Sequence, residues 1–175
     1  TIGCATKCDG FFRYALNKVG KKLGVKVSLV DVSAAGPEVN WEKYDGIIFP
    51  GGADINPEYY LPSVEPELQA YTRSLDHLVK YSAEGKRRDR IEYKMLQNYF
   101  SSDLTTNLPV LGVCRGMQML AVSQGIPLYV DIKTELGIRN RRYLYDRIYP
   151  ESGESLMNEL FSSSFRAFKR HHQGI

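Results

Sequence analysis

The sequence predicts an α/β domain built around a mostly parallel sheet. Residues 10–23 repeat apolar side chains at the spacing of one helical face, and residues 25–29 then alternate strictly between apolar and polar side chains, as in a half-buried strand. Residues 45–49 and 109–113 are short apolar runs that each lead into a glycine-containing segment. Helices that alternate with such strands are typical of parallel sheets, in which ligands bind at the carboxyl ends of the strands.

Two further helices are expected in the middle of the chain. Asp89 and Glu92 have the spacing of a capping box, which predicts a helix that begins at Asp89 and continues through Phe100. Residues 67–81 are amphipathic and form either a helix inserted over the site entrance or a plain surface helix.

The last third of the chain is less regular. Residues 137–154 have no clear periodicity and are interpreted as a loop in which short strands remain open. A strand is expected to begin near Phe165.

The composition limits the functions that the chain can have. With 175 residues, 43% hydrophobic and 25% charged, the chain has the composition of one globular domain, residues 1–175. The net charge of +3 is small, and the basic residues at 86–88 and 139–142 are expected to be solvated surface rather than a nucleic-acid site. No apolar stretch approaches the roughly 20 residues of a membrane span.

The number and spacing of the cysteines indicate what to expect of disulfides, cellular compartment and metal binding. An odd number, three, argues against a disulfide framework and indicates a reducing compartment, so a cytoplasmic location is expected. Cys4 and Cys8 lack the companion ligands that a structural zinc requires, so no metal site is expected. Cys114 stands apart from both.

Cys114 lies between Gly112 and Gly116, where an apolar run ends and helical periodicity begins. Glycines at these positions permit the sharp turn and close backbone approach of a nucleophile elbow. At a helix N-terminus the thiolate, which is the reactive form, is favoured over the thiol. The alternative is a buried structural cysteine.

Four motifs occur in order along the chain. They are G-x-C-x-G-x-Q at 112–118, P-G-G-x-D-x-x-P-x-x-Y at 50–60, R-D-x-x-E at 88–92 and H-H-Q at 171–173. Through them the chain resembles the class I glutamine amidotransferase-like proteins, and within these the peptidase C26 type that includes γ-glutamyl-γ-aminobutyrate hydrolase. The resemblance implies a flavodoxin-like fold, a mostly parallel sheet with flanking helices, in agreement with the periodicity.

The resemblance implies hydrolysis of γ-glutamyl amide bonds through a γ-glutamyl thioester on Cys114, without a cofactor or metal. Backbone N–H groups of Gly52 and Arg115 are the candidate donors of an oxyanion hole, because the first lies in an unobstructed glycine turn and the second follows the nucleophile.

A second group of residues is expected to bind the substrate. These candidates are Gly51, Gln118, His171, His172 and Gln173. Gln118 lies one helical turn after Cys114, so its amide can face the same pocket. Packing support is the alternative role for Gln118.

The chain departs from the family pattern in one respect. Members complete a Cys-His-Glu triad with an H-x-E motif downstream of H-H-Q, and none of His77, His171 and His172 is followed two residues later by a carboxylate. Either the domain is incomplete at its C-terminus, which is the favoured interpretation, or the chain is a degenerate member that lacks its general base.

Three functions therefore stay open. The first is a stand-alone γ-glutamyl hydrolase acting on a small substrate, without a nucleic-acid or membrane partner. The second is a glutaminase subunit that feeds ammonia to a synthase, and the third is an inactive member that binds a γ-glutamyl ligand or a protein. A homodimer also remains open.

Overall fold

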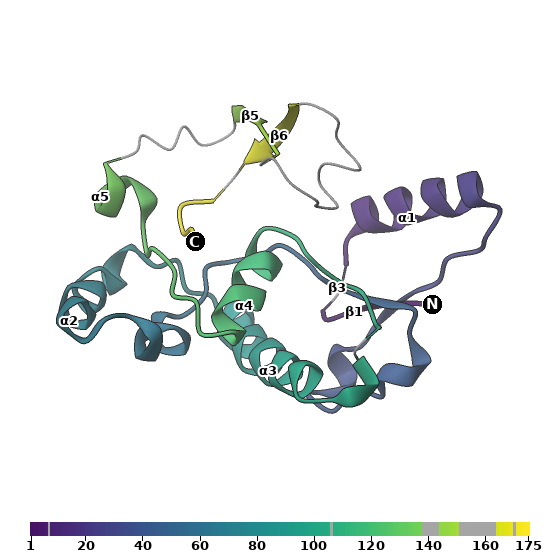
Figure 1. Ribbon diagram of the computed structural model, residues 1–175, viewed down its shortest axis with the longest axis horizontal. Helices are drawn as coiled ribbons and strands as arrows, with labels where there is room; N and C mark the ends of the chain where they lie inside the picture. The colour runs from purple at the N-terminus through teal and green to yellow at the C-terminus, as the bar shows by residue number, and fades with distance from the viewer. Residues whose placement is uncertain (7, 106, 138–143, 151–163, 170) are drawn as a thin grey trace.

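The computed structural model describes the chain except residues 7, 106, 138–143, 151–163 and 170. A four-stranded parallel sheet has the order β2-β1-β3-β4. Figure 1 labels its two central strands, β1 and β3. Its strands are β1 (Ile2–Cys4), β2 (Leu29–Asp31), β3 (Gly46–Phe49) and β4 (Val110–Gly112). The α-helices are α1 (Gly10–Leu23), α2 (Pro66–Ser74), α3 (Ala83–Phe100), α4 (Arg115–Ser123) and α5 (Ile132–Leu136), and a separate antiparallel hairpin pairs β5 (Leu144–Ile148) with β6 (Phe165–Lys169). The predicted α/β class is confirmed.

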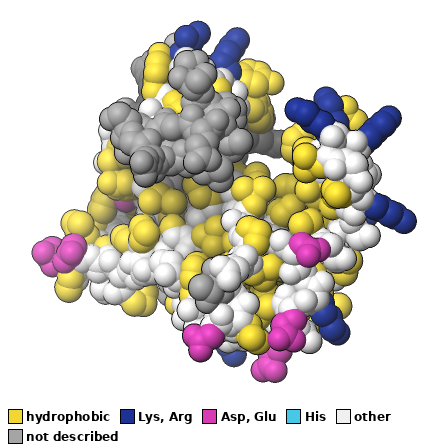
Figure 2. All heavy atoms as spheres, turned by 45° about the vertical axis from the view of Figure 1, so that its right-hand side comes forward, with side chains coloured by type: hydrophobic (Ala, Val, Ile, Leu, Met, Phe, Trp, Pro, Cys, Tyr) yellow, Lys and Arg dark blue, Asp and Glu magenta, His cyan; other side chains and the backbone are white. Residues whose placement is uncertain are grey.

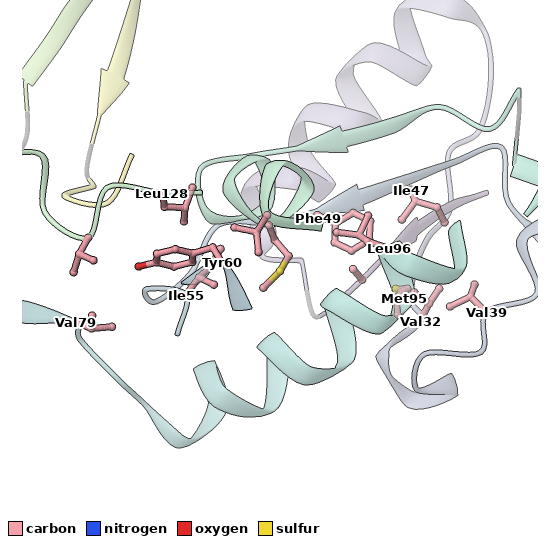
Figure 3. Packing of buried hydrophobic residues seen from close by; sticks show 14 of the residues in the cluster. Val32, Val39, Ile47, Phe49, Ile55, Tyr60, Val79, Met95, Leu96 and Leu128 are labelled. Atoms are coloured by element: carbon pink, nitrogen blue, oxygen red, sulfur yellow. The ribbon is translucent and has the colours of Figure 1, made fainter. Parts of the chain in front are cut away.

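Strand β3 is buried on both faces, and its alternating side chains define two layers. Ile47 and Phe49 belong to the main core, to which α3 contributes Met95 and Leu96 (Figure 3). Ile48 packs on the opposite face in a smaller cluster that includes α1 side chains. Helix α1 therefore covers one face of the sheet, and α3 and α4 cover the other.

The α1 side of the sheet is only partly covered. Leu111 of β4 pairs in register with Ile48, yet it is 54% exposed. In α1 the expected apolar face is half engaged, because Phe12 and Leu16 pack on the sheet while Val19 and Leu23 are exposed. Figure 2 shows further hydrophobic side chains on the face that it draws.

Two expected elements lie elsewhere than the periodicity predicts. The strand expected at 25–29 begins only at Leu29, because the parallel pairing with β1 starts at Leu29 opposite Ile2. The helix expected over 67–81 is divided, since α2 ends at Ser74 and a 3₁₀ turn follows at Asp76–Leu78.

The predicted start of α3 is wrong. The helix begins at Ala83, and the Ser82 hydroxyl caps it by accepting a hydrogen bond from the Gly85 N–H. Asp89 and Glu92 consequently lie in the helix interior and are buried. The capping-box spacing is coincidental there, because both carboxylates bind a buried arginine instead of helix amides.

The C-terminal region contains more regular structure than the sequence pattern indicates. The strand expected at Phe165 is confirmed as β6, and β5 lies in the stretch interpreted as a loop. Residues 138–143 and 151–154 of that stretch are outside the described residues, and so are the basic residues at 139–142. The H-H-Q segment, residues 171–173, follows β6 and is not itself a strand.

One disulfide is present, although the odd number of cysteines argues against a disulfide framework. Cys4, at the end of β1, is joined to Cys8, with a Cα–Cα distance of 6.0 Å. The odd number of cysteines leaves Cys114 as the free thiol among them. Since disulfides persist in oxidising environments, the cysteine count no longer supports a reducing compartment. In the described part of the chain no helix is long and apolar enough to cross a membrane.

Candidate active site

Cys114 occupies a strained turn between β4 and α4. Its backbone has φ 53° and ψ −113°, and it is the one non-glycine residue with a positive φ among those that the structure describes. Such a conformation costs about 1–3 kcal/mol and persists only where the surroundings fix it. Here Val113 N–H donates to Phe49 O at 2.9 Å on one side, and Gln118 N–H donates to Cys114 O at 3.1 Å on the other.

The strain presents the thiol to solvent. Cys114 is exposed and free, so the alternative of a buried structural cysteine is excluded. Strand β4 brings the residue to the carboxyl edge of the sheet, and α4 begins at the next residue. This is the geometry of a nucleophile elbow.

Both elbow glycines are required by close backbone contacts. A Cβ on Gly116 would lie 1.9 Å from the carbonyl oxygen of Phe49, and a Cβ on Gly112 would lie 2.6 Å from the backbone nitrogen of Met117. Neither distance is compatible with a side chain. The predicted role of the two glycines is therefore confirmed: they let α4 approach β3 and β4 closely enough to form the turn.

The glycine loop after β3 lies beside the elbow. A Cβ on Gly51 would be 3.6 Å from Cys114 Cβ, and one on Gly52 would be 3.0 Å from Arg115 Cδ. Within the described parts of the chain, the N–H groups of Gly52 and Arg115 have no protein acceptor. The two candidate oxyanion donors therefore lie close together, one in the glycine loop and one at the first residue of α4, with their N–H groups available.

A buried ion-pair cluster lies behind the elbow, formed by Arg88, Asp89, Glu92 and Arg115. The Arg115 guanidinium donates to one oxygen of Asp89 and to Oε2 of Glu92, and all three side chains are about 1% exposed or less. Arg88 Nε donates to Oε1 of Glu92 at 2.9 Å. The expectation that basic residues 86–88 are all solvated surface is therefore wrong for Arg88.

Burial determines the electrostatics of this cluster. It raises the pKa of Asp89, although the Arg115 charge and a hydrogen bond from the Asn56 N–H act in the opposite direction. Two guanidinium groups face two carboxylates, so the charges balance when both acids are ionised. Removing one partner of a buried pair typically costs about 3–5 kcal/mol, because the remaining charge is left uncompensated.

His172 lies between two carboxylates. Its Nε2 is 2.7 Å from Oδ2 of Asp54, in the loop after β3, and its Nδ1 is 3.2 Å from Oδ1 of Asp131, at the start of α5. The hydrogen bond to Asp54 raises the pKa of His172, against the effect of burial. In the protonated form both ring nitrogens donate, so this histidine links α5 to the glycine loop.

Gln173 and Gln118 connect the H-H-Q segment to the rest of the site. The Gln173 amide both donates to Ile55 O and accepts from Ile55 N–H, at 3.0 and 2.8 Å. Gln118 Nε2 donates to Gln173 O at 2.8 Å, and both glutamines are buried. His171 Nδ1 is 2.8 Å from Gln173 O.

The candidate residues thus fall into two groups. Cys114, Gly51, Gly52 and Arg115 meet at the elbow, whereas Gln118 and the H-H-Q segment meet one another through hydrogen bonds. Cavities of about 360 and 580 Å³ lie between other elements, and Cys114 lines neither of them. Among the described residues, no group of three His, Cys, Asp or Glu side chains is arranged to hold a metal.

The sequence analysis missed the charged partners in this site. It gave no role to the side chains of Arg88 and Arg115, nor to Asp54 and Asp131. The i, i+4 spacing of Arg88 and Glu92 was a usable signal, because such residues are neighbours on a helix surface. The pairing with Arg115 has no local signal, since 23 residues separate it from Glu92.

A parallel α/β sheet with a cysteine elbow at its carboxyl edge is consistent with the class I glutamine amidotransferase-like fold. The sequence model of the family described as Peptidase C26 matches residues 16–175, so the chain belongs to the Peptidase C26 family.

Several curated proteins are similar to the chain. "Putative glutamine amidotransferase PB2B2.05" of Schizosaccharomyces pombe is 31% identical over 138 residues, which cover 75% of this chain and 47% of that protein. "Putative glutamine amidotransferase-like protein YvdE" of Lactococcus lactis is 36% identical over 88 residues, 50% and 30% of the two chains. Protein NtpR of Enterococcus hirae is 29% identical over 119 residues, 68% and 43% of the two chains. The chain spans less than half the length of each.

Proposed function

We propose that the chain carries the nucleophile of a hydrolase that cleaves γ-glutamyl amide bonds. The observation that supports it most strongly is the backbone of Cys114, whose φ of 53° presents a free, exposed thiol at the N-terminus of α4. A protein gains nothing in packing from such strain, and strained residues cluster at active sites. Family membership and the names of the relatives agree with this chemistry.

The reaction begins with the thiolate of Cys114. Its sulfur adds to the γ-carbonyl carbon of the substrate, and the electron pair of the C=O bond moves to the oxygen. The N–H groups of Gly52 and Arg115 donate to that oxyanion; in other enzymes the loss of one such donor costs about 100- to 1,000-fold in rate. When the oxyanion re-forms the C=O bond, the C–N bond breaks and the leaving amine takes a proton from water. The γ-glutamyl thioester that remains on Cys114 is then hydrolysed by a second water, which releases the γ-carboxylate and the thiol.

We assign Gly51 to one side of the substrate pocket, beside the sulfur, and the H-H-Q segment to a second wall. Gly51 lies against Cys114 without a side chain, so a substrate carbonyl can approach the sulfur. Gln118 and Gln173 are already bonded to protein groups. We therefore assign them to fixing the wall in place.

A second candidate is a family member that binds a γ-glutamyl ligand without turning it over. It is favoured by the environment of His172, whose two ring nitrogens both face carboxylates and so lack a place for a substrate proton. The relatives' names support a third candidate, a glutaminase that passes ammonia to a partner.

The experiment is trapping of the thioester. The protein is mixed with γ-glutamyl 4-nitroanilide, quenched in acid and analysed by intact mass, with the Cys114→Ser variant as the control. A mass gain of one γ-glutamyl group in the wild type alone supports a cysteine acyl-transfer enzyme. Release of 4-nitroaniline over many turnovers distinguishes the hydrolase from a member that only binds. Absence of both an adduct and 4-nitroaniline release at saturating substrate contradicts the proposal.

A further inference from the structure

Arg88 is held rigidly against the glycine loop. Its Nη1 donates to Gly51 O at 3.0 Å, its Nη2 donates to Pro50 O at 3.2 Å, and its Nε donates to Glu92. Every nitrogen of the guanidinium therefore has an acceptor, and the residue is 9% exposed. A planar fork that is bonded on all sides fixes the orientation of both carbonyl groups.

Gly52 provides the space for this contact. A Cβ at Gly52 would lie 2.3 Å from Nη1 and 3.2 Å from Cζ of Arg88. Any side chain at residue 52 would displace the guanidinium. Arg88 can therefore occupy this position only because residue 52 is glycine.

The Gly51 carbonyl and the Gly52 N–H belong to the same peptide unit. The described backbone contains no cis peptide bond, and in a planar trans peptide the C=O and N–H bonds point in opposite directions. Since Arg88 holds the Gly51 oxygen on its own side, the Gly52 N–H is directed away from Arg88. A cation bonded to the oxygen also polarises the amide, which strengthens its N–H as a donor.

We infer that Arg88 is a positioning residue that aims and polarises the Gly52 N–H as an oxyanion donor; this rests on the proposed acyl transfer at Cys114. Glu92 extends the arrangement, because it bonds both Arg88 and the side chain of Arg115, whose own N–H is the second candidate donor. The buried ion-pair cluster thus connects the glycine loop to the first turn of α4 and keeps the two candidate donors in a fixed relation.

The test compares two chemistries of the same sulfur in the Arg88→Lys variant. Lysine keeps the positive charge beside Glu92 but, with a single nitrogen, cannot reproduce the planar fork on two carbonyls. Alkylation by iodoacetamide needs the thiolate and no oxyanion hole. Acylation by γ-glutamyl 4-nitroanilide needs both the thiolate and the oxyanion hole, and it is followed in a single turnover by intact mass. Arg87→Lys is the matched control, because Arg87 is exposed and pairs with exposed Glu84.

We expect Arg88→Lys to slow acylation by about 10- to 100-fold, less than the loss of a whole donor, while alkylation stays within about twofold of wild type. The apparent KM should change little, since the donor acts on the developing oxyanion and not on the bound substrate. An unchanged acylation rate overturns the inference. An equal fall in the rates of acylation and alkylation also overturns it, because that result indicates that the cluster only supports the elbow.

A readout without catalysis separates this inference from the proposed function. The amide resonance of Gly52, assigned by NMR, should shift in Arg88→Lys and stay in place in Arg87→Lys. If the wild type forms no thioester but the resonance shifts, the proposed function fails and the positioning by Arg88 stands. If the resonance does not shift, the positioning fails. Should Arg88→Lys not fold, the double variant Arg88→Met, Glu92→Gln removes one charge of each sign, and the same outcomes apply.

Discussion

Replacing Gly116 by alanine should distort the elbow through a single added methyl group. The Cβ would lie 1.9 Å from Phe49 O, 2.5 Å from Phe49 C and 2.8 Å from Phe49 Cβ. Two of these neighbours are backbone atoms of the central strand β3, so no rotamer change relieves the contact. Because Cβ contacts under 3.0 Å are essentially never found, α4 must move away from β3 by about 1 Å or more.

The cost follows from what that movement disturbs. Overpacking of a well-packed interior costs about 1–3 kcal/mol. The bond from Val113 N–H to Phe49 O, now 2.9 Å, uses the same carbonyl oxygen, and its loss adds about 1 kcal/mol. We expect Gly116→Ala to lose about 2–4 kcal/mol of unfolding free energy, a large part of the roughly 5–15 kcal/mol typical of a domain.

Gly10→Ala is the control, because it makes the same chemical change at a helix start where nothing lies within 4 Å of the added Cβ. It should leave stability unchanged or raise it by up to about 1 kcal/mol. Urea denaturation gives both free energies, and iodoacetamide labelling of Cys114 reports whether the elbow survives. If Gly116→Ala is as stable and as readily labelled as wild type, the packing argument for the elbow is wrong.

Three further outcomes are expected. Gly52→Ala should lower both the melting temperature and the rate of thioester formation, since its Cβ would lie 2.3 Å from Arg88 Nη1; a normal melting curve would contradict this. The stabilisation from protonated His172, whose pKa is raised, should be complete below about pH 6.5 and lost as pH rises through the raised value. The melting temperature should therefore fall more steeply with rising pH in wild type than in His172→Gln. Parallel curves for the two proteins would refute a stabilising role of protonated His172. Reducing the Cys4–Cys8 bond, which closes a loop of sequence separation 4, should cost about 2 kcal/mol in urea denaturation, and equal curves with and without reductant would exclude that contribution.

The elbow could be predicted because its signals are local. Gly112, Cys114 and Gly116 are close in sequence, and an apolar strand followed by helical periodicity already implies a sharp turn between them. The steric partner of Gly116, Phe49, is far away in sequence, but the need for a glycine at such a junction is general. The positive φ of Cys114 follows from the same geometry.

Helix α3 illustrates why other predictions failed. Ser82 and Asp89 are both acceptable N-cap residues, so local chemistry cannot choose between them. The choice is tertiary: Asp89 and Glu92 are buried, and a buried carboxylate requires a cationic partner, which α4 supplies through Arg115. The predicted start of strand β2 was wrong for a related reason. The strand begins where it pairs with β1, and its own alternation of apolar and polar side chains does not fix that point.

The sequence by itself determined the α/β class, the position of the cysteine elbow and the order of the motifs, because these depend on side-chain periodicity and on residues only a few positions apart. Only the tertiary structure decided which groups face one another: the cluster around Arg115, the contact of Arg88 with the glycine loop, and His172 between Asp54 and Asp131. Each of these contacts joins segments more than 20 residues apart, where nothing in the local pattern records which charge meets which. Burial then makes the pairing obligatory, since an unpaired charge inside a protein is too costly to keep.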